Sequence, residues 1–375
     1  MSNYKIPLYK PYIGDLEKKL VNEALDTGWV SSRGKFVEIF ESKFAEYCNR
    51  KYALTVCNGT AALHLALEAL ELKKGTGVIC PTLTYVSTAN AIKYAGLIPI
   101  FVDCDETCVS EYEQIKKGLD VAKKNNLEVS CILPVHLYGV VPNILEIKNL
   151  SIPIIDDCAE SFGSELNNKI SGSEDTEFSC FSFFGNKTIT TGEGGMIVSN
   201  NEDLISKALI LRSVGQMPSS TQRYLHVKLG YNYRLTNVAC AIGIGQLSKI
   251  DDILNKKRKI ANIYKNILIE NGLCDYLLPE PNNLNSNYWL VTIKMKSNIM
   301  REGLIIYLES KGIETRPAFL PIHAMVNLGE SYRVSCMKNS EEISSCSINL
   351  PSFPELTENE VNYICQNIID YCKNF

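Results

Sequence analysis

One lysine, Lys187, lies between a run of aromatic residues and a run of glycines in FSFFGNKTITTGEGGM, residues 181–196. Aromatic neighbours would shield its amine from water and favour the neutral, nucleophilic form, which can make a Schiff base with an aldehyde. The TTGEGG turn that follows would let the backbone approach a ligand closely, because glycine has no side chain. A lysine on an exposed loop is the commoner interpretation of a single lysine.

Two acidic residues end an apolar strand pattern in IIDDCAES, residues 154–161. A carboxylate at Asp156 or Asp157 could pair with a protonated heteroaromatic nitrogen, an interaction that is strongest in a dry site. Capping of the next helix by either acid explains the pair equally well. This stretch alone therefore leaves both interpretations open.

Asn-Gly-Thr ends another strand pattern in VCNGTAALHLAL, residues 56–67. The free backbone N–H groups of Gly59, Thr60 and Ala61 would lie at a helix start, where the positive end of the helix dipole favours a phosphate. An ordinary N-cap by Asn58 or Thr60 is the better explanation if this stretch is considered by itself.

The three stretches together fit one cofactor. Pyridoxal 5′-phosphate requires a phosphate cup, an acid beside the pyridinium nitrogen and a lysine for its aldehyde. In an open α/β sheet, ligands bind beyond the carboxyl ends of the strands, where all three stretches are expected. The sequence therefore predicts a pyridoxal phosphate site.

A repeating pattern of elements must position these residues. Short apolar runs at 53–57, 77–80, 98–103, 131–136 and 152–157 alternate with segments of helical period. Continuously apolar strands separated by amphipathic helices are typical of a parallel sheet that is covered on both faces. We therefore expect a doubly wound α/β domain in the first two thirds of the chain.

The last third has a different pattern. Residues 237–271 read as one long helical run that could bridge two domains, and strands at 287–295 and 348–353 belong to a smaller α+β unit. The predicted domains are a large cofactor-binding α/β domain at 1–245 and a small C-terminal domain at 246–375.

Composition argues against several classes of protein. The formal charge of −4 and pI near 5.8 indicate no basic face for nucleic acid. No apolar run is long enough to span a membrane and no signal peptide is recognisable, so we expect a cytoplasmic protein. The 14 cysteines, spread over 375 residues, should be reduced and mostly buried. The tightest pair, Cys104 and Cys108, lacks a second pair at zinc-finger spacing, and no metal site is predicted.

Nearly end to end, the chain resembles the DegT/DnrJ/EryC1/StrS family of sugar aminotransferases. The likeness rests on long stretches: TGWVSSRGK, NGTAALHLAL, PTLTYVSTANAI, PVHLYG, IIDDCAESFGS, FSFFGNKTITTGEGGM, LGYNYRLTNVACAIGIGQL, GIETRP and INLPSFP. The resemblance implies a pyridoxal-phosphate-dependent aminotransferase of fold type I, the aspartate aminotransferase fold. Such a fold has a mixed, mostly parallel sheet and a smaller C-terminal α+β domain.

The resemblance also implies the catalytic residues. Lys187 matches the lysine that bonds the cofactor and, once released, moves the proton during amino transfer. Asp157 matches the acid that keeps the pyridine nitrogen protonated, so that the ring accepts electrons. Tyr85 matches an aromatic residue that stacks on the ring. Lysine at the Schiff-base position distinguishes a transaminase from related dehydratases, which carry histidine there.

Further positions match cofactor-binding residues of the family. Ser182 and the backbone at Thr60 and Ala61 match the phosphate cup. Asn232 matches a residue that reaches the cofactor phosphate of the neighbouring subunit, which implies a homodimer with shared active sites. Glu160 stands near the cofactor's hydroxyl group, where many relatives carry glutamine and one subgroup that aminates a GDP-linked keto sugar carries glutamate.

By resemblance, the amino donor is L-glutamate and the acceptor is a nucleotide-linked 4-keto-6-deoxy sugar for surface polysaccharide, with GDP-4-keto-6-deoxymannose as the best single candidate. Leu225, Ser286 and Leu320 depart from the pattern of that subgroup, because they are smaller or less polar than the residues usual at the sugar-binding rim. Two alternatives stay open: a small phosphorylated ketone such as dihydroxyacetone phosphate as acceptor, or a regulatory protein that keeps the fold without turnover.

Overall fold

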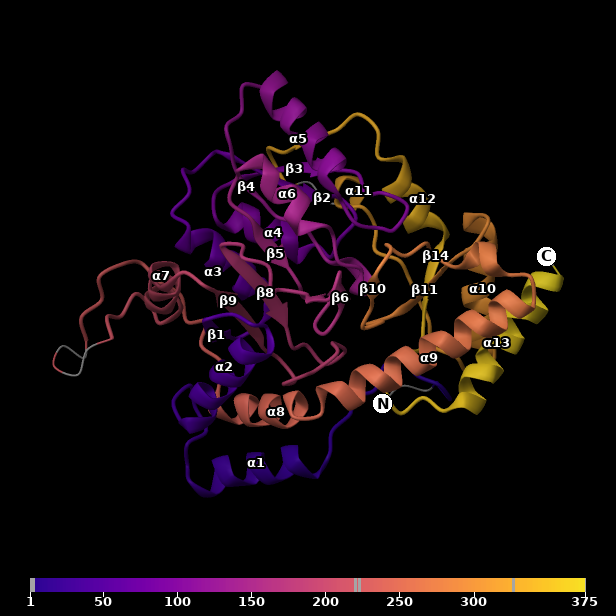
Figure 1. Ribbon diagram of the computed structural model, residues 1–375, viewed down its shortest axis with the longest axis horizontal. Coiled ribbons are helices and arrows are strands. Elements are labelled where there is room, and N and C mark those ends of the chain that lie inside the picture. Colours follow the sequence, from indigo (N-terminus) through magenta and orange to yellow (C-terminus); the bar gives the residue numbers. More distant parts are fainter. Residues whose placement is uncertain (1–3, 219–220, 222–223, 326–327, 375) are drawn as a thin grey trace.

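The chain folds around a mixed β-sheet, seen in the centre of Figure 1. The structure is a computed structural model and describes residues 4–218, 221, 224–325 and 328–374. Two four-stranded sheets, β1-β9-β8-β5 and β13-β3-β2-β4, are joined by parallel bridges from Ile132 to Ile154 and from Val135 to Asp157. Their strands are β1 (Tyr52–Val56), β2 (Gly77–Pro81), β3 (Ile98–Val102), β4 (Val129–Ile132), β5 (Ile155–Asp157), β8 (Phe178–Ser182), β9 (Gly195–Ser199) and β13 (Tyr332–Arg333).

Most neighbouring strands in this sheet run parallel. The pairs β13/β3, β2/β3, β2/β4 and β5/β8 are parallel, whereas β9 runs antiparallel to both β8 and β1. Strands β2, β3 and β9 are buried along their whole length, which explains their uninterrupted apolar sequences. The predicted mixed, mostly parallel sheet is confirmed.

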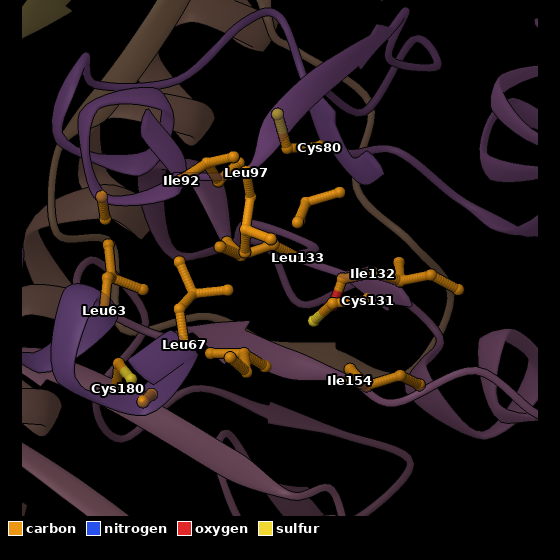
Figure 2. Close-up of a cluster of buried hydrophobic side chains, with 14 of the residues drawn as sticks. Leu63, Leu67, Cys80, Ile92, Leu97, Cys131, Ile132, Leu133, Ile154 and Cys180 are labelled. Carbon is orange, nitrogen blue, oxygen red and sulfur yellow. The ribbon is translucent and has the colours of Figure 1, made fainter. Parts of the chain in front are cut away.

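Helices cover both faces of the sheet. Alternate residues of β9 belong to different hydrophobic clusters: Ile197 packs in the cluster that includes α3, and Met196 and Val198 pack in the one that includes α2 and α8. Figure 2 shows part of the first cluster, with Leu63 and Leu67 of α3 near the strands. The helices of this part are α1 (Asp15–Asp26), α2 (Lys35–Tyr47), α3 (Gly59–Ala69), α4 (Ser87–Tyr94), α5 (Tyr112–Lys124), α6 (Ile144–Ile147), α7 (Glu202–Arg212) and α8 (Asn237–Leu247).

A smaller antiparallel sheet, β11-β14-β12, lies beyond the large one and packs with the C-terminal helices (Figure 1). A short ladder, β10-β6-β7, forms a third, separate sheet. The elements are β6 (Glu165–Leu166), β7 (Lys169–Ile170), α9 (Ile250–Glu270), β10 (Leu284–Asn285), β11 (Val291–Lys294), α10 (Asn298–Ser310), β12 (Arg316–Pro317), α11 (Ile322–Met325), α12 (Lys338–Cys346), β14 (Ser347–Leu350) and α13 (Glu358–Lys373).

The predicted helical run at 237–271 consists of two helices, because α8 ends at Leu247 and α9 begins at Ile250. Ile253 of α9 packs in the cluster of the large sheet, and Tyr264, further along the same helix, packs in the cluster of the small sheet. Helix α9 therefore joins the two cores, and the boundary at 245/246 stays a prediction.

The N-terminal segment crosses between the two parts. Ile6 forms a parallel bridge with Ile313 and packs in the small-sheet cluster, whereas α1 packs against α8. Among the described residues, no helix is both long and apolar enough to cross a bilayer. All 14 cysteines are free and most are buried, as predicted.

Candidate active site

A cleft of about 430 Å³ lies where β2, β5 and β8 end, and residues from β12 and β14 close its other side. This is the edge of the sheet at which ligands were expected. Predicted site residues that line it are Gly59, Thr60, Tyr85, Asp157, Glu160, Ser182 and Lys187. Ala61 and Asn232 are not among its lining residues.

The start of α3 forms one wall of the cleft. Asn58 caps this helix by accepting a hydrogen bond from the Ala61 N–H at 2.8 Å. That N–H has a partner within the chain, and its contact with a phosphate stays a prediction. The N–H groups of Gly59 and Thr60 lie in the first turn, where a helix offers them no acceptor. A Cβ on Gly59 would come within 2.8 Å of Ser182 Cβ, so only glycine permits this close approach of α3 to β8.

Asp157 lies on the cleft side of β5, and Asp156 lies on the opposite side, because successive residues of a strand face opposite ways. Thr88 Oγ1 donates to Asp157 Oδ2 at 2.8 Å, and the Ala159 N–H donates to Oδ1 at 3.2 Å. Burial raises the pKa of Asp157, while these two hydrogen bonds and the charge of Lys187 act against the rise.

Asp156 belongs to a different environment. Its Oδ2 accepts hydrogen bonds from Thr176 and Ser179, and burial raises its pKa to about 7. A carboxylate oxygen of Asp156 lies within 4.8 Å of a ring nitrogen of His136 and of the Cys158 sulfur. His136 and Asp156 line a separate, narrow cavity that Asp157 does not border. Of the two acids, only Asp157 is therefore placed to serve the cleft.

Glu160 and Lys187 form a buried ion pair, with 3.3 Å between Oε1 and Nζ. The other carboxylate oxygen of Glu160 accepts the Tyr138 N–H at 3.0 Å, and Tyr138 holds that N–H in place with a left-handed backbone (φ 53°). Burial raises the pKa of Glu160, and the adjacent Lys187 ammonium opposes the rise. The pair places a positive and a negative group side by side, with both side chains shielded from solvent.

An aromatic wall faces the lysine. Lys187 Nζ lies 3.8 Å from the ring centroid of Trp289, which stacks on Tyr138 with 6.2 Å between centroids. Tyr138 stacks in turn on Phe319, whose ring is 5.7 Å from that of Tyr85. Tyr85 is 56% exposed and lines the cleft, so its ring is available to a ligand.

Sequence reasoning missed several residues of the cleft. Ser87 and Thr88 follow a strand just as Gly59 does, and that shared strand-to-helix position could have found them. Ser87 Oγ accepts a hydrogen bond from Thr60 Oγ1 at 2.8 Å. Trp289 and Arg316 come from the C-terminal part, and no local pattern in the sequence indicated that they would reach the cleft.

Asn232 forms an antiparallel bridge with Ser213 at the base of an arm that projects from the body near α7 (Figure 1); the described residues of this arm are 213–218, 221 and 224–232. Its Oδ1 accepts a hydrogen bond from Arg234 at 2.7 Å. Leu225 is on this arm and is 41% exposed. Ser286, in contrast, is buried and donates to the Gly139 carbonyl.

The cleft fits pyridoxal phosphate. The glycine-lined helix start suits a phosphate, Asp157 offers an acceptor for a pyridinium N–H, and Lys187 is an amine within the same space. These features, on a mixed sheet with one antiparallel strand next to the lysine loop, define a pyridoxal-phosphate-dependent enzyme of fold type I.

Comparison with known proteins gives the family. The model of the DegT/DnrJ/EryC1/StrS aminotransferase family matches residues 11–369, and the chain belongs to this family. It is 44% identical to the GDP-perosamine synthase of Escherichia coli O157:H7, with 98% of both chains covered, and 40% identical to that of Vibrio cholerae, with 98% and 99% covered. A solved GDP-4-keto-6-deoxymannose-3-dehydratase with bound GDP-perosamine is 26% identical, with a TM-score of 0.87 over 98% of this chain and 100% of that one.

These findings confirm three predictions made from the sequence: the family, fold type I and a pyridoxal-phosphate-dependent aminotransferase activity. The individual roles of the site residues stay predictions that the geometry supports.

Proposed function

We propose that this aminotransferase moves the amino group of L-glutamate to GDP-4-keto-6-deoxymannose and so makes GDP-perosamine for surface polysaccharide. The observation that carries the proposal is the full-length similarity to two GDP-perosamine synthases, at 44% and 40% identity. The similarly folded dehydratase with bound GDP-perosamine indicates that this fold can hold that nucleotide sugar.

The chain's own residues supply the parts that the reaction needs. Pyridoxal phosphate, when bound, supplies an aldehyde that takes up the amino group and a ring that accepts electrons. The first turn of α3 and Ser182 would hold its phosphate, and Asp157 would hold a proton on its ring nitrogen. Lys187 is the base that moves a proton during the transfer, and Glu160 holds its amine in position.

We also propose a cytoplasmic homodimer in which each subunit completes the other's site. Asn232 does not line the cleft of its own chain, and it lies at the base of a projecting arm. An amide at this place can donate hydrogen bonds to the phosphate of a neighbouring subunit's cofactor.

An acceptor screen tests the substrate. The purified enzyme is converted to the amino form with L-glutamate, freed of donor, and mixed with single ketones while the absorbance of the cofactor is followed. GDP-4-keto-6-deoxymannose should restore the original spectrum. The proposed acceptor is wrong if dihydroxyacetone phosphate restores the spectrum and the GDP-sugar does not. Lys187→Ala is the control, and it should show no conversion by glutamate.

A further inference from the structure

The free amine of Lys187 occupies a defined place in the cleft. Its Nζ lies 3.8 Å from the ring centroid of Trp289 and 3.3 Å from Glu160 Oε1, and the lysine side chain is only 13% exposed. An aromatic face and a carboxylate both attract an ammonium. We propose that Trp289 and Glu160 form a resting site for the Lys187 ammonium whenever that amine is not bonded to the cofactor.

A resting site matters because the lysine has to leave and return in every cycle, and this inference rests on the proposed function. With pyridoxal phosphate bound, Lys187 would give up its bond to that group when the nitrogen of the donor takes its place. The donor enters as an ammonium, and when its three N–H protons pass to Nζ, Lys187 leaves as an ammonium. Stabilising this ammonium at a fixed place would make Lys187 a better leaving group and keep it within reach for the return step.

Hydrogen bonds from three sides fix the Trp289 platform. Its indole N–H donates to the carbonyl of Asn186, the residue before Lys187, at 2.6 Å. Its backbone N–H donates to Asn287 Oδ1 at 2.9 Å, and its carbonyl accepts a hydrogen bond from the buried Lys257 Nζ at 3.3 Å. The ring is therefore coupled to the loop that carries the lysine.

Asn287 links this platform to Glu160. It is completely buried, and its Nδ2 donates to the carbonyls of Glu160 and Phe162 and to Thr188 Oγ1, each at 3.0 Å. One amide thus holds the segments that carry the carboxylate, the ring and the lysine. Neither side of the resting site can shift without breaking these bonds.

A cycle of four proteins tests the resting site without donor or acceptor: wild type, Trp289→Leu, Lys187→Met and the double variant. Equilibrium dialysis against pyridoxal phosphate gives the cofactor affinity of each. Since the ring stabilises the free ammonium, Trp289→Leu should tighten cofactor binding by about 2- to 30-fold when Lys187 is present. The same substitution should have no effect beside Lys187→Met, which keeps the length of the lysine and removes its charge.

Two further variants separate the resting site from packing. Trp289→Phe keeps an aromatic face with a weaker attraction for cations, so its effect should be intermediate; it also serves if Trp289→Leu does not fold. Trp29→Phe changes the other tryptophan, which is 56% exposed and outside the cleft, and should leave the affinity unchanged. Equal weakening of cofactor binding with and without Lys187 would mean that Trp289 contacts the cofactor or only packs, and would overturn the proposal.

The donor half-reaction gives a second measurement. With glutamate, Trp289→Leu should need about 2- to 30-fold more donor for half-conversion, because the released lysine has lost its resting site. If wild type does not react with glutamate at all, the proposed function fails, whereas the affinity cycle still decides on the resting site. An unchanged glutamate requirement in Trp289→Leu would count against the resting site alone.

Discussion

Lys257 on α9 should make the stability of this protein depend on pH in a way that one substitution removes. It is completely buried, and its Nζ donates to the carbonyls of Ser352 at 2.6 Å and Trp289 at 3.3 Å. No carboxylate among the described residues pairs with it. Burial lowers the pKa of Lys257 from 10.5 to about 7.

The sign and size of the effect follow from that pKa. Between pH 7 and 10.5, Lys257 of the unfolded chain binds a proton that the folded protein does not bind, so stability rises with pH. Below pH 7 both states bind the proton and this contribution no longer changes. The slope is about 1.4 kcal/mol per pH unit, and the whole interval corresponds to ~5 kcal/mol of unfolding free energy.

Urea unfolding of wild type and Lys257→Met at pH 7.0 and at about pH 8.5 measures this contribution. Cysteine thiols, whose usual pKa is about 8.5, titrate alike in both proteins and cancel in the comparison. The unfolding free energy of wild type should rise by ~2 kcal/mol relative to that of Lys257→Met over this interval, because methionine cannot titrate. Loss of the two carbonyl hydrogen bonds adds a cost that does not depend on pH.

Lys259→Met is the matched control, since Lys259 is two residues away on the same helix and its side chain is 73% exposed. The unfolding free energy of Lys259→Met should differ from that of wild type by the same amount at both pH values. If the same holds for Lys257→Met, the assignment of a depressed pKa to the buried lysine is refuted.

Other substitutions test the site. Lys187→Ala should lower kcat at least about 100-fold while the circular dichroism spectrum is kept, and near wild-type turnover would exclude it as the catalytic base. Asp157→Asn should lower turnover severely while pyridoxal phosphate still binds in dialysis, and full activity would leave Asp157 no role at the ring nitrogen. Gly59→Ala should weaken cofactor binding through its clash with Ser182; no weakening in dialysis would show that α3 can move away. Asn232→Ala should retain cofactor poorly, and mixing it with Lys187→Ala should restore affinity at the one site that keeps its lysine; no gain after subunit exchange, or an active monomer, would contradict the shared site.

The parts of this protein that sequence could predict are those with local causes. Buried parallel strands must be apolar throughout, so the order of strands and helices was readable from residue patterns. Lys187, Asp157 and Gly59 were found because each directly follows or lies near a strand end, and strand ends of one sheet meet at one edge.

What could not be predicted depends on contacts between distant segments. Trp289 reaches Lys187 only because the C-terminal part folds back over the cleft, and nothing near Trp289 in sequence encodes that. The residue pattern alone left Asp156 and Asp157 equivalent, and the family resemblance selected Asp157. The physical reason lies in the register of β5, which turns Asp157 and not Asp156 toward the cleft. The sequence was also compatible with either partner for the Ala61 N–H; in the structure this group donates to the capping Asn58, and its contact with a phosphate stays a prediction.

The contact between Ile6 and Ile313 has a consequence for synthesis on the ribosome. The Ile6 N–H donates to the Gly312 carbonyl, the Glu314 N–H donates to the Ile6 carbonyl, and Leu8 donates its N–H to the Glu314 carboxylate. A chain that emerges from its N-terminus makes these apolar residues long before it makes their partners. Ile6 and Leu8 therefore stay in a non-native environment until residues 312–314 have been made. Partly translated chains should expose this segment to chaperones, and the docking of Ile6 cannot precede the emergence of Ile313 from the ribosome.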